Sequence, residues 1–290
     1  MTRLRVLRFL LLLCFTLTLN AQRRSEPGLT VTPALVEPGS PELIELSAPV
    51  ATKVEGEWLG HKLQFFQRRN TWVALSGVDV ETKPQKSILH ITAQGAAGPL
   101  EFSRTIEIHP PHYRTGKLTV APKFVEPGPE EQKEIAAGSE IKSRIFAVSA
   151  PEPLWQGSFR APVKFPPTDS FGTRRMFNGK LASIHKGMDF RAPSGTVVRA
   201  SNSGVVVLAR HLYFEGNCVI IDHGLGLYTL SMHFSRIDVQ EGQHVSAGDK
   251  LGLSGATGRV TGPHLHWAVR WENAYLDPAK LLRLNLASIR

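Results

Sequence analysis

Two short histidine-containing segments, far apart along the chain, most constrain its fold. The first is HKGMD, from His185 to Asp189, and the second is HLH, from His264 to His266. Two imidazole nitrogens and one carboxylate oxygen can hold a catalytic zinc and leave its fourth position to water. Residues 263–269 are typical of a β-strand, on which His264 and His266 would point to the same face. The fold must bring both segments together, and either histidine of the pair could then bind metal while the other moves protons.

The residues around these segments resemble the lysostaphin-like zinc metallopeptidases, which cut peptide bonds in bacterial peptidoglycan. HKGMD matches the family's HxGxD, and residues 261–266 match its TGPHLH. The resemblance covers about residues 165–278 and implies a β-rich peptidase domain with one zinc ion per chain. Further matching segments follow in the family's order at residues 192–198, 203–206, 216–217, 221–224 and 245–249.

The resemblance also implies a role for each of five side chains. Spacing alone leaves open which histidine of the HLH pair binds the metal, and the family pattern assigns the second. The zinc ligands would be His185, Asp189 and His266, and the catalytic histidines would be His233 and His264. Around His233 the chain departs from the family, which has Tyr two residues earlier and Leu directly after, where this chain has Ser231 and Phe234.

These residues are sufficient for metal-assisted hydrolysis. Zinc lowers the pKa of bound water from about 15.7 to about 7 and polarises the scissile carbonyl. The chain has no HExxH motif that would supply a glutamate base. An imidazole, with an ordinary pKa near 6.5, can take that role. One histidine of His233 and His264 would take a proton from water, and the other would stabilise the oxyanion or protonate the leaving amine.

The first residues are typical of an export signal. Three arginines precede an apolar run from Phe9 to Leu19, and a plausible cleavage site follows Ala21. The run is shorter than the roughly 20 residues that span a bilayer. We therefore expect an exported, periplasmic protein with no stable membrane insertion after cleavage. Secretion, or anchoring by an uncleaved signal, is the alternative.

Charge and cysteine content narrow the possible partners. The formal net charge of +9 falls to +6 without the three arginines of the signal, which suits an anionic polymer such as the cell wall. The basic residues are scattered, with no basic stripe interleaved with aromatics, so nucleic acid is not expected as a partner. After signal cleavage Cys218 is the only cysteine. It lies in an apolar run, which predicts a buried filler rather than a disulfide or a nucleophile.

The sequence predicts a mainly β protein in four parts. These are a signal peptide at residues 1–21, an N-terminal β-sandwich-like domain at 22–112, a linker with one helix at 113–164 and a zinc metallopeptidase domain at 165–290. Short strands are predicted at residues 43–46, 72–75, 87–91 and 104–108, and a helix from Glu130 to Phe146. The N-terminal domain could act as a spacer, bind the wall or a protein partner, or shield the groove.

These observations favour an exported zinc metalloendopeptidase of peptidoglycan, cutting D-Ala–diaminopimelate crosslinks. The alternatives are a glycyl endopeptidase, a peptidase of exported proteins, or a non-enzymatic or latent regulator of cell-wall amidases. A regulator that has lost its ligands is disfavoured because all five site residues are present. His223, in IDHG, is expected to have a structural hydrogen-bonding role, and Asn178 to be a turn residue.

Overall fold

Short strands separated by turns make up most of the chain, as the sequence predicts. The computed structural model describes residues 28–286, apart from the side chains of residues 180–182. The expected signal peptide therefore lies outside the described residues. Within the described range, no helix combines the length and the hydrophobicity that crossing a bilayer requires.

The N-terminal part is a sandwich of two antiparallel four-stranded sheets. Inward-facing residues such as Ile44 on one sheet and Ile91 on the other are almost fully buried in a shared core. One sheet has the order β1-β2-β6-β5: Leu29–Thr32, Pro41–Ser47, Thr71–Gly77 and Phe66–Arg68. The other has the order β4-β3-β7-β8: His61–Gln64, Ala51–Trp58, Gln85–Gly95 and Gly98–Ile108.

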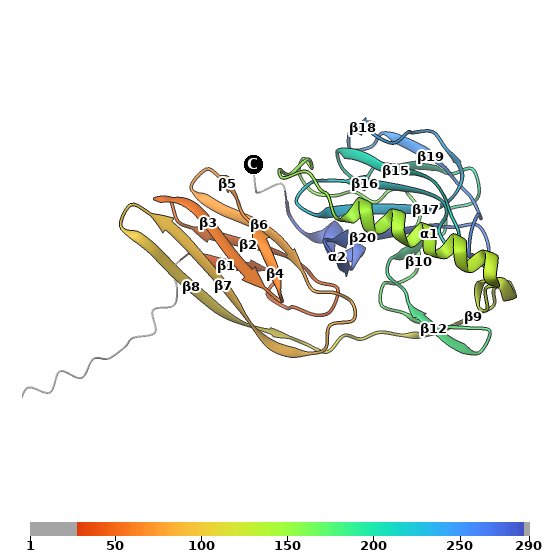
Figure 1. Cartoon of the computed structure of the whole chain (residues 1–290), viewed down its shortest axis with the longest axis horizontal. Helices are drawn as coiled ribbons and strands as arrows, with labels where there is room; N and C mark the ends of the chain where they lie inside the picture. Colours follow the sequence, from red (N-terminus) through yellow and green to blue (C-terminus); the bar gives the residue numbers. More distant parts are fainter. Residues whose placement is uncertain (1–27, 287–290) are drawn as a thin grey trace, which may run out of the picture.

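The linker contributes the long helix α1, Pro129–Phe146, after the strand β9, Thr115–Leu118, and the short helix η1, Pro122–Phe124. Proline in the first turn of α1, two glutamates beside it and Arg144 in the last turn suit the helix dipole. One face of the helix packs on the C-terminal sheet through Ile141, Ile145 and Phe146. Figure 1 shows α1 lying across that sheet.

A ten-stranded sheet forms the framework of the C-terminal part. Its main path is β10-β13-β20-β17-β16-β15-β18, with β14 and β21 at its margins and β19 joining β14 to β17. In chain order the strands are β10 Pro167–Asp169, β13 Met188–Phe190, β14 Val197–Arg199, β15 Gly204–Leu212, β16 Gly216–Asp222, β17 Leu227–Ile237, β18 His244–Val245, β19 Lys250–Ser254, β20 Leu265–Trp271 and β21 Ala274–Leu276. The short helix α2, Pro278–Arg283, follows β21. Cys218 is fully buried in this sheet, as expected for an apolar filler.

A fourth, three-stranded sheet ties the linker to the C-terminal part. The hairpin of β11, Arg174–Phe177, and β12, Lys180–Ile184, is extended by β9, which runs parallel to β11. The Asn178 side chain in the hairpin turn bonds the backbone N–H and carbonyl of Val120. Asn178 has a φ of 49°, a left-handed conformation that asparagine tolerates, so it is the expected turn residue.

The sandwich and the C-terminal sheet share one continuous apolar core, and they lie side by side in Figure 1. A Cβ placed on Gly77 would lie 2.4 Å from Leu276 Cδ2, so β6 and β21 approach closely. Polar contacts reinforce this packing: Tyr275 N donates to Asp79 Oδ2 at 2.8 Å, and His61 Nδ1 lies 2.6 Å from Glu272 Oε2.

Candidate metal centre

Strand pairing brings the predicted metal ligands together. Asp189 on β13 lies directly opposite His266 on β20 in the antiparallel register, and His185 follows the end of β12. Asp189 Oδ1 lies 2.8 Å from His266 Nδ1 and 3.2 Å from His185 Nε2, and the two nitrogens are 3.0 Å apart. Among the described residues this is the one group of three or more potential ligands able to hold a metal ion.

The donor set fits a zinc ion. Zinc–nitrogen and zinc–oxygen bonds near 2.1 Å place tetrahedral donors about 3.4 Å apart, a few tenths of an ångström more than the 2.8 to 3.2 Å separations here. His185 Nδ1 donates to the Ser170 carbonyl at 3.0 Å, so neutral His185 presents the Nε2 lone pair to the cluster. Burial lowers the pKa of His266 to about 4 and so favours its neutral, ligating form. Burial opposes ionisation of Asp189, but contacts with both histidines hold its pKa well below the usual range.

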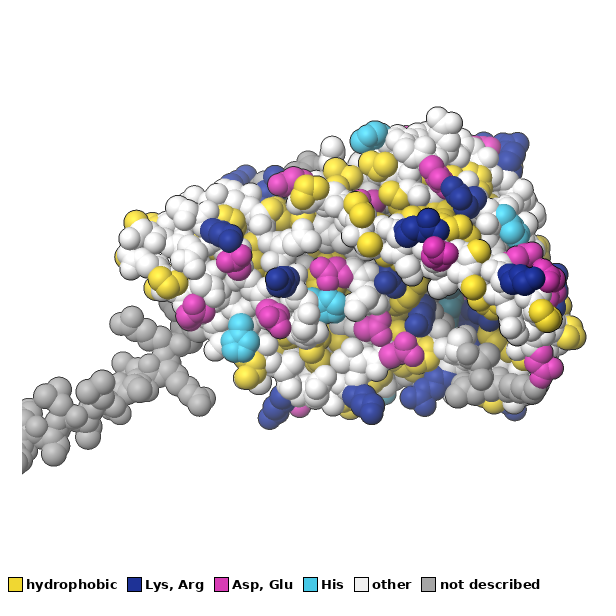
Figure 2. All heavy atoms as spheres, viewed as in Figure 1, with side chains coloured by type: hydrophobic (Ala, Val, Ile, Leu, Met, Phe, Trp, Pro, Cys, Tyr) yellow, Lys and Arg dark blue, Asp and Glu magenta, His cyan; other side chains and the backbone are white. Residues whose placement is uncertain are grey.

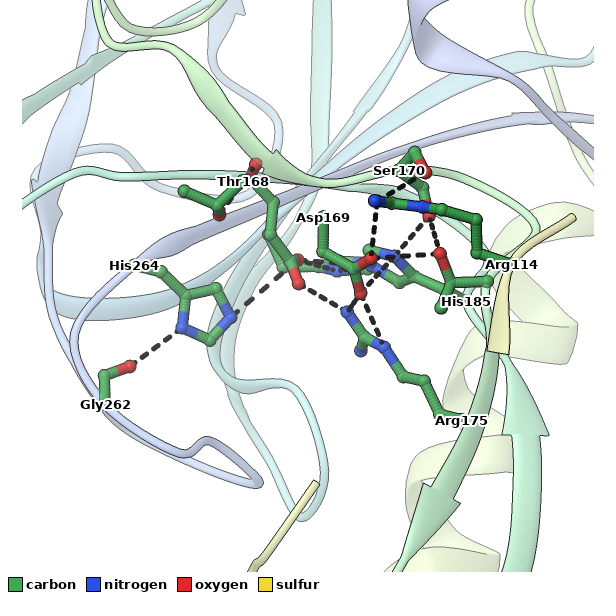
Figure 3. Close-up of polar contacts among 11 residues, drawn as sticks. Arg114, Thr168, Asp169, Ser170, Arg175, His185, Gly262 and His264 are labelled. Carbon is green, nitrogen blue, oxygen red and sulfur yellow. Dashed lines mark hydrogen bonds and ion pairs between the residues drawn. The ribbon is translucent and has the colours of Figure 1, made fainter. Parts of the chain in front are cut away.

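Two residues that the sequence analysis did not single out support the ligands. Arg175 on β11 contacts Asp189 Oδ2 and donates to Asp169 Oδ2 at 2.7 Å. Asp169 Oδ2 lies 3.3 Å from His185 Nδ1. Burial would raise the pKa of Asp169, but hydrogen bonds from His185 and Arg175 hold it well below its usual range. Figure 3 shows Arg175 pointing at Asp169.

These contacts make the centre favourable for positive charge. Burial disfavours the charged form of His185, yet Asp169 and Asp189 together raise its pKa. Two carboxylates around one buried imidazole thus stabilise a cation at the cluster. A metal ion satisfies the same demand while leaving both histidines neutral.

The two predicted catalytic histidines lie beside the ligands. His233 sits at a β-bulge of β17 with φ of 66°, and its backbone N–H leaves the strand pairing to donate to Glu215 O at 3.0 Å. The ring centroid of His233 is 4.9 Å from that of His264 and 6.0 Å from that of His266. His264 Nε2 lies 3.8 Å from Asp189 Oδ1, and Figure 3 shows the ring directed at that carboxylate.

Backbone carbonyls fix the orientation of both rings. His233 Nδ1 donates to Thr257 O and His264 Nδ1 to Gly262 O, each at 2.8 Å. Each neutral ring therefore carries its unprotonated Nε2 on the side opposite that carbonyl. Burial, with His264 and His266 nearby, lowers the pKa of His233 to about 3, so this imidazole is neutral at pH 7 and can accept a proton.

A groove of about 680 Å³ runs over the centre. The hairpin of β11 and β12, the linker and residues 259–264 form its walls, and Arg175, Lys186, Arg191 and Arg259 are its basic lining residues. In Figure 2 the surface is hollowed below α1, with basic side chains around the hollow. None of the described residues before residue 113 lines this groove. Outside residues 165–290, the described residues that line the groove are Gly116, Leu118 and Val120 of the linker.

Two other histidines have structural contacts. His223 is fully buried, with Nδ1 2.7 Å from Ser203 O and Nε2 2.8 Å from Thr229 Oγ1, as expected for a structural role. His61, which the sequence analysis left without a role, bonds Glu272 and packs against Trp271 at 5.0 Å between ring centroids. No spacing signal could have revealed His61, because its partners belong to the other end of the chain.

Comparison with known proteins agrees with this geometry. Residues 183–278 match the model of Peptidase family M23. Peptidoglycan DD-endopeptidase ShyA of Vibrio cholerae is 48% identical over 101 residues, which cover 34% of this chain and 24% of ShyA. DD-carboxypeptidase/endopeptidase Mpg of Neisseria meningitidis is 41% identical over 98 residues, which cover 34% of this chain and 23% of Mpg. The chain thus spans about a quarter of the length of these curated relatives.

A likeness to one crystal structure extends beyond this segment. A Pseudomonas aeruginosa protein assigned to peptidase M23 is 28% identical to this chain, with a TM-score of 0.67. The alignment covers 85% of this chain and 94% of that one. The similarity therefore includes much of the N-terminal part and not only the segment with the metal centre.

Proposed function

We propose that this chain is an exported zinc metalloendopeptidase of peptidoglycan, with its C-terminal part a peptidase of family M23. The convergence of His185, Asp189 and His266 beneath an open groove, with His233 and His264 beside them, is the observation that carries the proposal. The substrate bond we propose is the D-Ala–diaminopimelate crosslink. The names of ShyA and Mpg support a peptide bond of the wall.

We assign the zinc ion to His185 Nε2, Asp189 Oδ1 and His266 Nδ1. When bound there, zinc supplies water of lowered pKa and polarises the scissile carbonyl. Arg175 and Asp169 orient the ligands through the bonds to Asp189 and His185.

The two remaining histidines divide the proton transfers. His233, neutral and held by Thr257, accepts the proton of the attacking water at Nε2. His264, held by Gly262 on the opposite ring nitrogen, donates from Nε2, once that atom carries a proton, to the oxyanion or the leaving amine.

Digestion of purified sacculi tests the proposal. Mature protein (residues 22–290) would be compared with a zinc-chelated sample and with His264→Ala, and products identified by mass spectrometry. We expect crosslinked dimers to decrease and monomers to increase with the active protein alone. Cleavage at glycyl bonds would favour a glycyl endopeptidase. Inactivity of zinc-loaded protein would favour the regulator of amidases.

A further inference from the structure

A second cavity, of about 930 Å³, adjoins the groove of the metal centre. It lies between α1, the β3–β4 turn of the sandwich and the β20–β21 turn. Tyr275 lines both cavities, and its ring is contacted by Lys186 of the groove at 5.1 Å and by Arg270 of the second cavity at 5.2 Å. The two cavities therefore meet at Tyr275.

Strand β20 connects the metal centre to the second cavity. Side chains of a strand alternate between faces, so His266, Ala268 and Arg270 point the same way. At about 3.3 Å per residue, Arg270 lies roughly 13 Å along the strand from His266. Ala268, between them, is fully buried beneath neighbouring side chains, so the surface route from the groove to the second cavity passes over Tyr275, which lines both. An extended peptide lying along this path would reach Arg270 three to four residues from the metal.

None of the described acidic side chains forms an ion pair with the guanidinium of Arg270. Its Nε is buried without a hydrogen-bond partner. The guanidinium packs between Phe146, at 4.3 Å from the ring centroid, and Tyr275. Such stacking fixes the plane of the guanidinium and leaves its terminal N–H groups available.

The other charged groups of the cavity have partners. Lys142 contacts Glu215, and Glu272 contacts His61 at 2.6 Å. Among the described residues, Arg270 is thus the cation of this cavity left to bind an anion. Planar carboxylates match the N–H fork of arginine. Other anions of the wall, such as phosphodiesters, are not part of a peptide that could extend from the metal centre to Arg270.

We propose that Arg270 binds a free carboxylate of the peptide substrate, three to four residues from the scissile bond. Phe146 and Tyr275 hold the guanidinium in place, and the route over Tyr275 joins this subsite to the groove of the metal centre. The inference rests on the proposed function, because it takes the scissile bond to lie at the metal. It adds a second recognition point and a preference for substrates with an unmodified carboxylate.

Binding of two matched peptides tests this subsite. The zinc-loaded His264→Ala protein would be titrated by calorimetry with a crosslinked D-Ala–diaminopimelate peptide whose carboxylates are free, and with the same peptide as carboxamides. We expect the free acid to bind about 10- to 100-fold more tightly, because hydrogen bonds to charged groups are the stronger ones. Adding Arg270→Gln should abolish this preference and leave the affinity for the carboxamide unchanged. Adding Arg236→Gln, which removes an exposed arginine paired with Asp238, should preserve it.

A spectroscopic readout covers the case in which Arg270→Gln does not fold. The Nε–H resonance of Arg270 in the His264→Ala protein should shift on titration with the free acid and not with the carboxamide. Equal binding of the two peptides, binding of neither, or a preference that survives Arg270→Gln would overturn the subsite. Cleavage of both peptides at equal rates by unmodified protein refutes the subsite alone. A carboxylate preference without any cleavage refutes the endopeptidase alone.

Discussion

Gly187 lies against His266, and the space between them leaves no room for a side chain. A Cβ at Gly187 would be 2.5 Å from His266 Nε2 and 2.7 Å from the Trp267 carbonyl. The glycine of HKGMD thus allows the loop with His185 to approach β20 closely enough for the ligands to meet.

Gly187→Ala should therefore displace His266 and weaken zinc binding. We expect at least a tenfold loss of affinity, in the range seen when the support of a metal ligand is removed. Competition with a chromophoric chelator measures it. Gly262→Ala is the matched control, because a Cβ there meets nothing within 4 Å. Equal zinc affinity in the Gly187→Ala and Gly262→Ala variants would contradict the steric argument.

Arg175→Met should lower zinc affinity about 10- to 100-fold, as the loss of an outer-shell partner does. The substitution leaves Asp169 and Asp189 without the guanidinium that bridges them. Chelator competition again gives the measurement. The neighbouring Arg174 is exposed, so Arg174→Met should change little. If both variants bind zinc as the unmodified protein does, the bridge has no role in holding the ligands.

Glu42 on β2 predicts an unusual pH dependence of stability. Both carboxyl oxygens are buried without hydrogen bonds, and burial, partly offset by Lys280, raises the pKa of Glu42 to about 9. Because the folded pKa exceeds the unfolded one of about 4.5, this group favours the folded state below pH 4.5. Its contribution is lost as the pH rises toward 9. At pH 7 the raised pKa of Glu42 lowers the free energy of unfolding by about 3 kcal/mol relative to its value below pH 4.5.

Glu42→Gln should remove this dependence, making the variant more stable than the unmodified protein at pH 8 and similar at pH 4. Urea unfolding at both pH values measures the difference in free energy. Glu45→Gln, on the partly exposed face of the same strand, is the control and should leave the pH dependence as it is. If the stability of the Glu42→Gln variant changed with pH as steeply as that of the unmodified protein, the prediction for Glu42 would be wrong.

The sequence predicts those features that local pattern encodes. Alternating apolar residues predict β2, β6, β7 and β8, and the prolines and acidic residues near Glu130 predict α1. The proximity of His185, Asp189 and His266 is what the motif resemblance implies, and the fold brings them within contact distance. The bridge of Arg175 could not be found this way, because it depends on the hairpin of β11 and β12 folding back over β13. Glu42 precedes the strand predicted at residues 43–46, so the local pattern does not reveal that its carboxylate is buried.

Two measurements on single alanine variants distinguish the proposed zinc ligands from the proposed proton-transfer histidines. His185→Ala removes a ligand, so both zinc content and cleavage should be lost. His233→Ala removes a base that does not bind the metal, so zinc should remain while cleavage falls by about 10²- to 10⁴-fold, the usual contribution of a general base. Zinc content by mass spectrometry and the rate on sacculi give the two readouts.

His211→Ala is the control for these variants. His211 is exposed, and within the described part of the chain its ring has one hydrogen-bond partner, Asn217, at 3.3 Å. It should retain both zinc and activity. Loss of zinc from His233→Ala would make His233 a ligand rather than the base. Full activity in that variant, with zinc bound, would instead leave His264 as the group that takes the proton, since its ring is the other imidazole beside the ligands.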